Sequence, residues 1–123
     1  MRDLYNEVKI CDAWNKVKPW RFITLTNKED KFLIYDGEDK KGNKYEMKSL
    51  RDSYQNGEYE TVLMPVSKVG CFGILTMIYE FYDAIYYIRY SHHKFKNIQI
   101  KHINGRRHFI IPKRELSYLC RNY

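Results

Sequence analysis

The chain has 123 residues, of which 44% are hydrophobic and 30% are charged, and its formal net charge at pH 7 is +7. This length predicts a single domain over residues 1–123, and the composition excludes a disordered chain because it supplies enough apolar surface for a core. Three cysteines (Cys11, Cys71 and Cys120) form no CxxC pair and argue against a disulfide framework. Because no apolar signal segment follows Met1, we expect a cytoplasmic protein.

The first half of the chain predicts one helix followed by short strands. Apolar residues recur at helical spacing over residues 4–17, and Lys18-Pro19 ends this amphipathic helix. Runs rich in β-branched and aromatic residues predict strands over 20–26, 31–35, 44–48 and 59–66. The charged, glycine-containing residues 36–43 predict a turn, and Ser49 is placed to cap a short helical piece over 50–54.

Residues 69–88 form a long apolar run in which one apolar stripe has helical spacing. The stripe consists of Ile74, Ile78, Phe81, Ile85 and Ile88. A membrane span is the alternative, but the acids at positions 80 and 83 would each cost about 3 kcal/mol near mid-bilayer. We therefore expect a buried central helix and no membrane partner.

The C-terminal region contains the clearest local signal, because Asn104-Gly105 is typical of a two-residue β-hairpin turn. The flanking runs 98–103 and 106–111 predict the two strands, with Lys101 opposite His108 and Ile100 opposite Phe109. Pro112 is expected to start a short helix over 113–121. The predicted fold class is α+β, with an antiparallel β-sheet packed on one long central helix, an N-terminal helix, and a C-terminal β-hairpin plus short helix.

The positive charge is concentrated in residues 89–123. This segment has nine Lys or Arg residues against one acid, Glu115, which gives it a charge of +8, and it also contains all four histidines. Residues 1–88 have 13 basic and 14 acidic residues. A charge confined to one region favours a polyanionic partner, either nucleic acid or an acidic protein surface.

The predicted contacts to nucleic acid or to a protein partner are Lys101, Arg106, Arg107 and His108 on the hairpin, flanked by His92, His93, Lys94 and Lys96. A β-ribbon that carries such cations on one face fits a groove or lies along phosphates. Binding of this kind falls steeply with salt, because each neutralised phosphate releases counterions.

The segment from Asn104 to Leu116 (NGRRHFIIPKREL) resembles the end of excisionase-type and MerR-type winged helix-turn-helix modules. In those families a wing with paired arginines leads into a short helix, so the resemblance implies that Arg106 and Arg107 face the DNA backbone. The upstream residues lack the Ala-rich helix, tight turn and recognition helix of those families. The chain is therefore not assigned to either of them.

We expect a small nucleic-acid-binding accessory protein of phage or mobile-element type, and no enzyme. One alternative is a non-enzymatic inhibitor or adaptor that docks its basic face on a nucleic-acid-processing or host-defence enzyme, with Tyr54, Tyr59 and Tyr90 as anchors. Another is a small basic ribonuclease that uses His92, His108, Arg107 and Tyr118, although no spacing singles out an acid and a base.

No cofactor motif occurs, and the spacing of the histidines and Cys120 matches no standard zinc pattern, so neither a cofactor nor a metal is expected. A homodimer is an open alternative, because a two-fold axis would set two hairpins side by side.

Overall fold

The computed structural model describes residues 4–26, 35–50, 60–69 and 75–122. In chain order, with η for a 3-10 helix, the elements are α1 (Leu4–Val17), η1 (Pro19–Arg21), β1 (Thr24–Leu25), β2 (Gly37–Glu38), β3 (Lys44–Ser49), β4 (Thr61–Pro65), α2 (Val66–Val69), β5 (Leu75–Glu80), β6 (Ala84–Arg89), α3 (His92–Phe95), β7 (Ile100–Ile103), β8 (Arg106–Pro112), η2 (Lys113–Glu115) and β9 (Ser117–Arg121).

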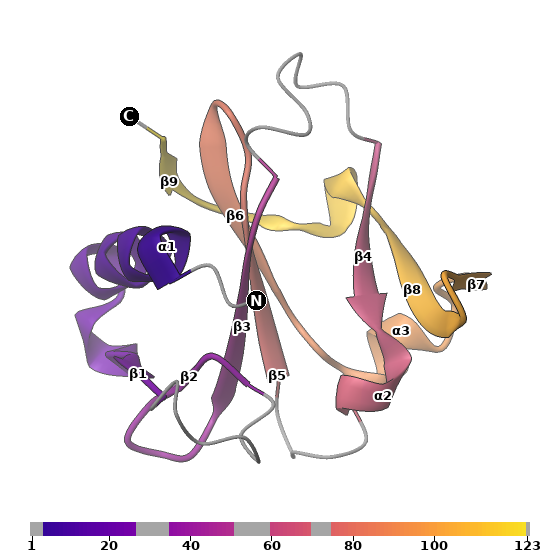
Figure 1. Ribbon diagram of the computed structural model, residues 1–123, viewed down its shortest axis with the longest axis horizontal. Helices are drawn as coiled ribbons and strands as arrows, with labels where there is room; N and C mark the ends of the chain where they lie inside the picture. The colour runs from indigo at the N-terminus through magenta and orange to yellow at the C-terminus, as the bar shows by residue number, and fades with distance from the viewer. Residues whose placement is uncertain (1–3, 27–34, 51–59, 70–74, 123) are drawn as a thin grey trace.

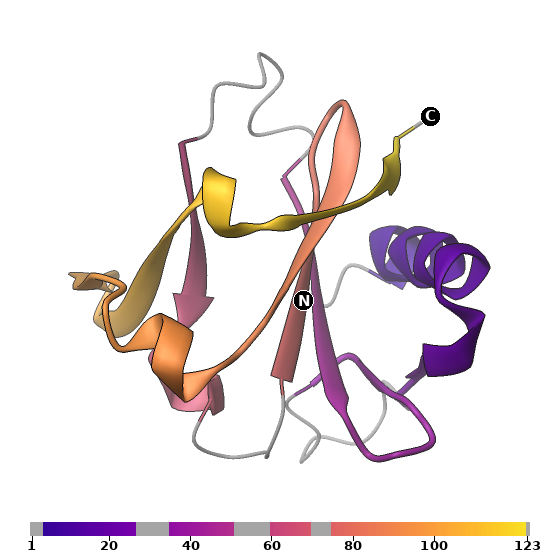
Figure 2. The ribbon, with the colours of Figure 1, turned by 180° about the vertical axis from the view of Figure 1, so that it is seen from behind.

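The strands form two sheets. Six strands form a mixed sheet in the order β1-β2-β3-β5-β6-β9, in which β3 and β5 are parallel and the other neighbours are antiparallel. A second, antiparallel sheet of three strands has the order β4-β8-β7. Figures 1 and 2 show α1 beside one face of the large sheet and the small sheet beside the other face. These described residues therefore form three layers, with a core on each side of the large sheet.

This arrangement contradicts the predicted antiparallel sheet on one long central helix. Val69, the first residue of the apolar run, ends α2, and residues 75–88 contain no helix but form β5 and β6, which pair as antiparallel neighbours. All six residues of β5 are buried, because α1 covers one face of the strand and the small sheet covers the other. A strand buried on both faces has a continuous apolar sequence without alternation, and such a sequence does not distinguish a strand from a buried helix.

The helical spacing of that stripe was coincidental, since its residues are divided between the two cores. Ile78 and Ile85 pack in the core under α1, whereas Phe81 and Ile88 pack in the core between the two sheets. Ile74 lies outside the described residues.

Helix α1 is confirmed with the predicted bounds. Its buried face contains Ile10, Cys11 and Trp14, which lie against the large sheet. The helical backbone hydrogen bonds continue to Lys18, whose N–H donates to the carbonyl of Trp14 at 2.7 Å. Pro19 then begins η1. The spacing of apolar residues was therefore a sufficient signal here, because only one face of the helix is covered.

The C-terminal hairpin is confirmed, but the short helix predicted after it is wrong. Residues 113–115 form only the 3-10 turn η2, and β9 then runs as an edge strand beside β6. Within β9, Tyr118 is 59% exposed while Leu119 is buried, which is the alternation of a strand. The winged-helix resemblance consequently extends no further than the hairpin, since the 3-10 turn η2 and the strand β9, and not a helix, follow it.

Of the other predicted strands, 44–48 is confirmed as β3, and β4 lies within the predicted range 59–66. The predicted strand 20–26 is wrong in its first part, where η1 forms, and only Thr24–Leu25 is extended as β1. The predicted turn 36–43 includes the short strand β2. The predicted strand 31–35 and helical piece 50–54 lie outside the described residues except at their ends. In the described part of the chain, no helix has the length and apolar character needed to cross a bilayer.

Candidate nucleic-acid interface

The β7–β8 hairpin lies at one end of the molecule, and α1 lies at the opposite end of the long axis (Figure 1). Its turn residues Asn104 and Gly105 have φ angles of 52° and 78°. Positive φ at both positions is the type I′ geometry, whose twist matches that of the flanking strands. Lys101 pairs with His108 and Ile103 with Arg106, in the predicted register. Lys101, Arg106 and His108 therefore share the face that points away from the core.

The predicted contact residues of the hairpin are accessible. Lys101, Arg106 and Arg107 are exposed, and His108 is half-buried. None of the three basic residues forms an ion pair with a carboxylate in the described part of the chain. Nδ1 of His108 lies 3.1 Å from the carbonyl oxygen of Arg106. Because a carbonyl only accepts, Nδ1 carries a proton in this contact, and Nε2 is left for another partner.

A hollow of about 390 Å³ adjoins the hairpin tip and adds a residue that the sequence did not single out. It is lined by Val66, Ser67, Lys68, Arg106 and Arg107. The pairing of Pro65 with His108 places the start of α2 beside the first residues of β8. Lys68 thus joins the two arginines only through strand pairing between distant segments, which no local sequence signal predicts.

Lys68 has a buried acidic partner behind this surface. Its Nζ lies 2.7 Å from Oε2 of Glu46 on β3, and Glu46 is only 8% exposed. Burial, with a further contribution from the negative charge of Asp36, raises the pKa of Glu46 to about 7, and the ion pair with Lys68 opposes that rise. Oε1 of Glu46 is buried without a hydrogen-bond partner among the described residues. The carboxylate therefore offers only one oxygen to Lys68.

Helix α3 and its C-cap residue Lys96 carry the flanking residues that we predicted. His92, His93, Lys94 and Lys96 are all exposed. Phe95 between them is buried, and its ring centroid lies 5.1 Å from that of Phe109 on β8, which fixes α3 to the hairpin. Nζ of Lys94 donates to the carbonyl of Glu115 at 3.0 Å and lies 3.6 Å from its carboxylate.

The other cations of the basic segment lie elsewhere, so the segment does not form one continuous ridge. Arg89 lines a hollow with Lys18 and Arg21 on the α1 side of the large sheet. Nζ of Lys113 lies 4.6 Å from the ring centroid of Phe81, over the face of that ring. The candidate nucleic-acid interface therefore consists of the hairpin, α2 and α3.

The groups of the ribonuclease alternative are spread over both sheets, and the described residues include only Tyr90 of the three anchors of the adaptor alternative. Tyr118 lies on β9 opposite Tyr86 in the large sheet, whereas Arg107 and His108 lie on β8 of the small sheet. For the adaptor alternative, Tyr54 and Tyr59 lie outside the described residues. Tyr90 is half-buried, with its ring centroid 4.9 Å from that of Phe95, and is therefore a packing residue.

Thiol and metal chemistry find little support in the described residues. Cys11 and Cys120 are free thiols, and Cys71 lies outside the described residues. Burial is the main cause that raises the pKa of Cys11, to about 11, so its nucleophilic thiolate form is disfavoured. The described residues contain no group of three or more His, Cys, Asp or Glu side chains placed to hold a metal ion.

Comparisons of the chain with protein-family models, with curated proteins and with solved structures found no match.

Proposed function

We propose that this chain is a small nucleic-acid-binding accessory protein that holds phosphates at its C-terminal hairpin and catalyses no reaction. The observation that carries the proposal is the placement of Arg106 and Arg107, exposed at the hairpin tip, beside Lys68 around one hollow. Guanidinium groups bind phosphate oxygens in a bidentate geometry, and Lys adds a point charge. Phosphate contacts position a protein without reading bases, so we expect little sequence dependence.

The neighbouring cations extend this surface. Lys101 lies diagonal to Arg106 on the outer face of the hairpin, and diagonal neighbours on a sheet stay within reach of long side chains. The histidines of α3 add positive charge when they are protonated.

We place the protein in the cytoplasm, as one of the accessory proteins that phages and mobile elements encode. A homodimer would carry two such hairpins, and size-exclusion chromatography with light scattering measures this directly.

Fluorescence anisotropy with labelled random-sequence DNA and RNA, at low and at high salt, tests the proposal. The Arg106→Glu/Arg107→Glu variant is expected to bind more than tenfold more weakly than the wild type. Lys16→Glu/Lys48→Glu is the matched control, because it makes the same change in net charge at exposed positions on α1 and β3. The proposal fails if the wild type does not bind at low salt. It also fails if both variants lose affinity equally, since net charge alone would then explain the binding.

An acidic protein surface would engage the same cations, so the adaptor is the second outcome of this test. A wild-type chain that binds no nucleic acid at low salt, yet captures one discrete protein through Arg106 and Arg107, would replace the nucleic acid with a protein partner. Incubation with labelled RNA addresses the ribonuclease alternative, for which cleavage by the wild type but not by His108→Ala is required.

A further inference from the structure

Two exposed aromatic side chains line a second hollow, together with residues of the β2–β3 turn. Figure 1 shows β2 and the start of β3 near α1, at the end of the molecule away from the hairpin. Trp20 is 71% exposed and Phe22 is 53% exposed, although aromatic side chains of this size usually bury most of their surface. The hollow has a volume of about 470 Å³. One wall contains Trp20, Arg21 and Phe22, and the other contains Asp39, Lys40 and Lys41.

The wall that carries the aromatic residues is fixed from behind. Nε1 of Trp14 donates to the carbonyl of Arg21 at 3.0 Å. The side chain of Asn15 accepts from the N–H of Ile23 at 2.7 Å and donates to its carbonyl at 3.0 Å. The backbone between the two exposed rings and directly after them is therefore anchored to α1. Rings held in place before binding lose little conformational entropy when a ligand arrives.

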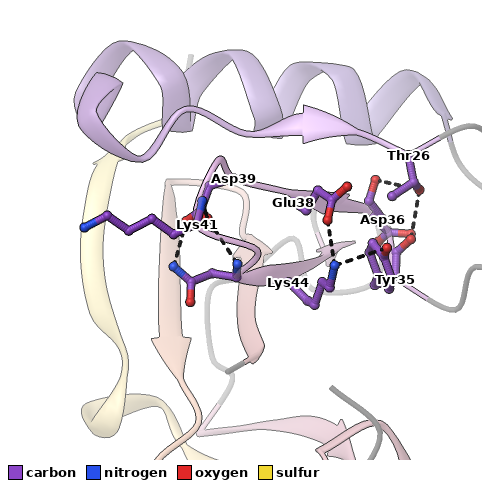
Figure 3. A network of polar contacts seen from close by, with 8 residues as sticks. Thr26, Tyr35, Asp36, Glu38, Asp39, Lys41 and Lys44 are labelled. Atoms are coloured by element: carbon purple, nitrogen blue, oxygen red, sulfur yellow. Dashed lines mark hydrogen bonds and ion pairs between the residues drawn. The ribbon is translucent and has the colours of Figure 1, made fainter. Parts of the chain in front are cut away.

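The opposite wall is a turn organised by one carboxylate (Figure 3). Asp39 accepts hydrogen bonds from the N–H of Lys41 at 2.9 Å, the N–H and side chain of Asn43 at 3.1 and 2.9 Å, and the hydroxyl of Tyr45 at 2.8 Å. Burial alone would raise the pKa of Asp39, but these bonds, chiefly from Asn43 and Tyr45, lower it on balance. Its oxygens are thus occupied within the turn, while Lys40 and Lys41 are exposed. In Figure 3 the side chain of Lys41 extends away from the bonded network.

Further cations surround the exposed tryptophan. Arg21 also lines an adjacent hollow of about 200 Å³ that contains Lys18, Tyr87 and Arg89. Nζ of Lys18 lies 5.6 Å from the ring centroid of Trp20 and 5.0 Å from that of Tyr87. Accessible aromatic rings therefore stand inside a rim of positive charge, which is the combination that binds unpaired bases and their phosphates.

We infer that this hollow, the Trp20 site, binds an unpaired nucleotide of a single-stranded nucleic acid. The base stacks on Trp20 and Phe22, and the adjoining phosphates lie among Arg21, Lys40 and Lys41. The volume lies within the range that ordinary small-ligand sites occupy. Bases in a duplex are already stacked and cannot reach an aromatic ring, so the site selects single strands. The inference rests on the proposed function and specifies its ligand class.

The test compares a labelled oligothymidylate with a labelled duplex of the same length, using wild type, Trp20→Ala and Arg106→Glu/Arg107→Glu. Tyr5→Ala is the matched control, because Tyr5 is an aromatic residue that is 82% exposed on α1. Base stacking on one aromatic ring is worth roughly ten- to a hundredfold in affinity. We expect Trp20→Ala to lose roughly that factor for oligothymidylate and to retain duplex binding, while Tyr5→Ala binds both like wild type.

Intrinsic fluorescence gives an independent readout of the same site. Trp14 is only 2% exposed, so quenching of tryptophan fluorescence on addition of unlabelled oligothymidylate reports mainly on Trp20. The Trp20→Phe variant should show no such quenching but should keep part of the affinity for oligothymidylate. If Trp20→Ala binds oligothymidylate like wild type and no quenching occurs, the Trp20 site is refuted while the hairpin proposal stands. If Trp20→Ala loses single-strand binding but the hairpin variant binds both probes normally, the hairpin proposal is refuted and the Trp20 site stands.

Discussion

Nζ of Lys68 lies 2.7 Å from Oε2 of Glu46, and this ion pair joins α2, next to the small sheet, to β3 of the large sheet. The same lysine lines the hollow with Arg106 and Arg107. A buried carboxylate whose pKa is raised to about 7 therefore lies directly behind the proposed phosphate-binding surface. This arrangement has a measurable consequence for stability.

Stability should decrease as pH rises from about 4.5, the ordinary pKa of Glu46, to about 7, its pKa in the folded chain. Between these values the folded protein holds a proton that the unfolded chain has released, so a rising pH favours unfolding. The full effect is on the order of 3 kcal/mol above pH 7. Urea unfolding measured across this pH range should show the slope in wild type and a much flatter profile in Glu46→Gln.

The comparison uses the change with pH and not the absolute stability, because Glu46→Gln also removes the partner of Lys68. Asp39 does not interfere, because its pKa is lowered from the ordinary value of 3.8. The stability that its carboxylate contributes is therefore lost only as pH falls below about that value. Equal pH profiles for Glu46→Gln and wild type would show that Glu46 does not titrate in this range.

The fully buried carboxylate of Glu80 should depend strongly on its cation. Nζ of Lys9 lies 2.6 Å from Oε2 of Glu80, and Ser49 and Asn122 donate to the same carboxylate at 2.8 and 3.1 Å. Lys9→Met leaves a buried charge without its counterion and should destabilise the fold by about 3 kcal/mol or more. The double variant Lys9→Met/Glu80→Gln should be more stable than Lys9→Met in urea unfolding. A double variant that is less stable than Lys9→Met would contradict this account.

Gly37 on β2 is expected to tolerate no side chain. A Cβ at this position would lie 2.6 Å from Cγ2 of Ile23 and 3.1 Å from the carbonyl oxygen of Thr24. Gly37→Ala should therefore cost about 1–3 kcal/mol through overpacking. Thermal unfolding of a double-mutant cycle with Ile23→Ala checks the cause, because the cost of Gly37→Ala should shrink once Ile23 is truncated. An unchanged cost would place the strain at the Thr24 backbone instead.

Elements with local signals were predicted correctly from the sequence. The hairpin register follows from Asn104-Gly105, because these two residues adopt positive φ readily and set a two-residue loop. Helix α1 follows from its single apolar face. Strands β5 and β6 were mistaken for a helix, because burial on both faces removes the alternation that would identify a strand.

The candidate sites could be predicted only in part, for a related reason. The cations of the hairpin lie close together in sequence, so a charge count found them. Lys68 lines a hollow with Arg106 because β4 pairs with β8, a contact between distant segments. Trp20 and Lys40, which are also distant in sequence, likewise line one hollow. Contacts between distant segments depend on sheet order, and the sheet order could not be derived once β5 and β6 were read as a helix.

The salt dependence of binding tests the central claim most directly. For duplex DNA, the logarithm of the association constant falls with the logarithm of salt concentration, with a slope whose magnitude drops by about 0.9 for each phosphate contact that is removed. If the hairpin holds phosphates, Lys101→Gln/Arg106→Gln/Arg107→Gln should lower the magnitude of the slope by about 2 to 3, while Lys16→Gln should leave it unchanged. An unchanged slope in the triple variant, or no binding by the wild type at low salt, would contradict the account.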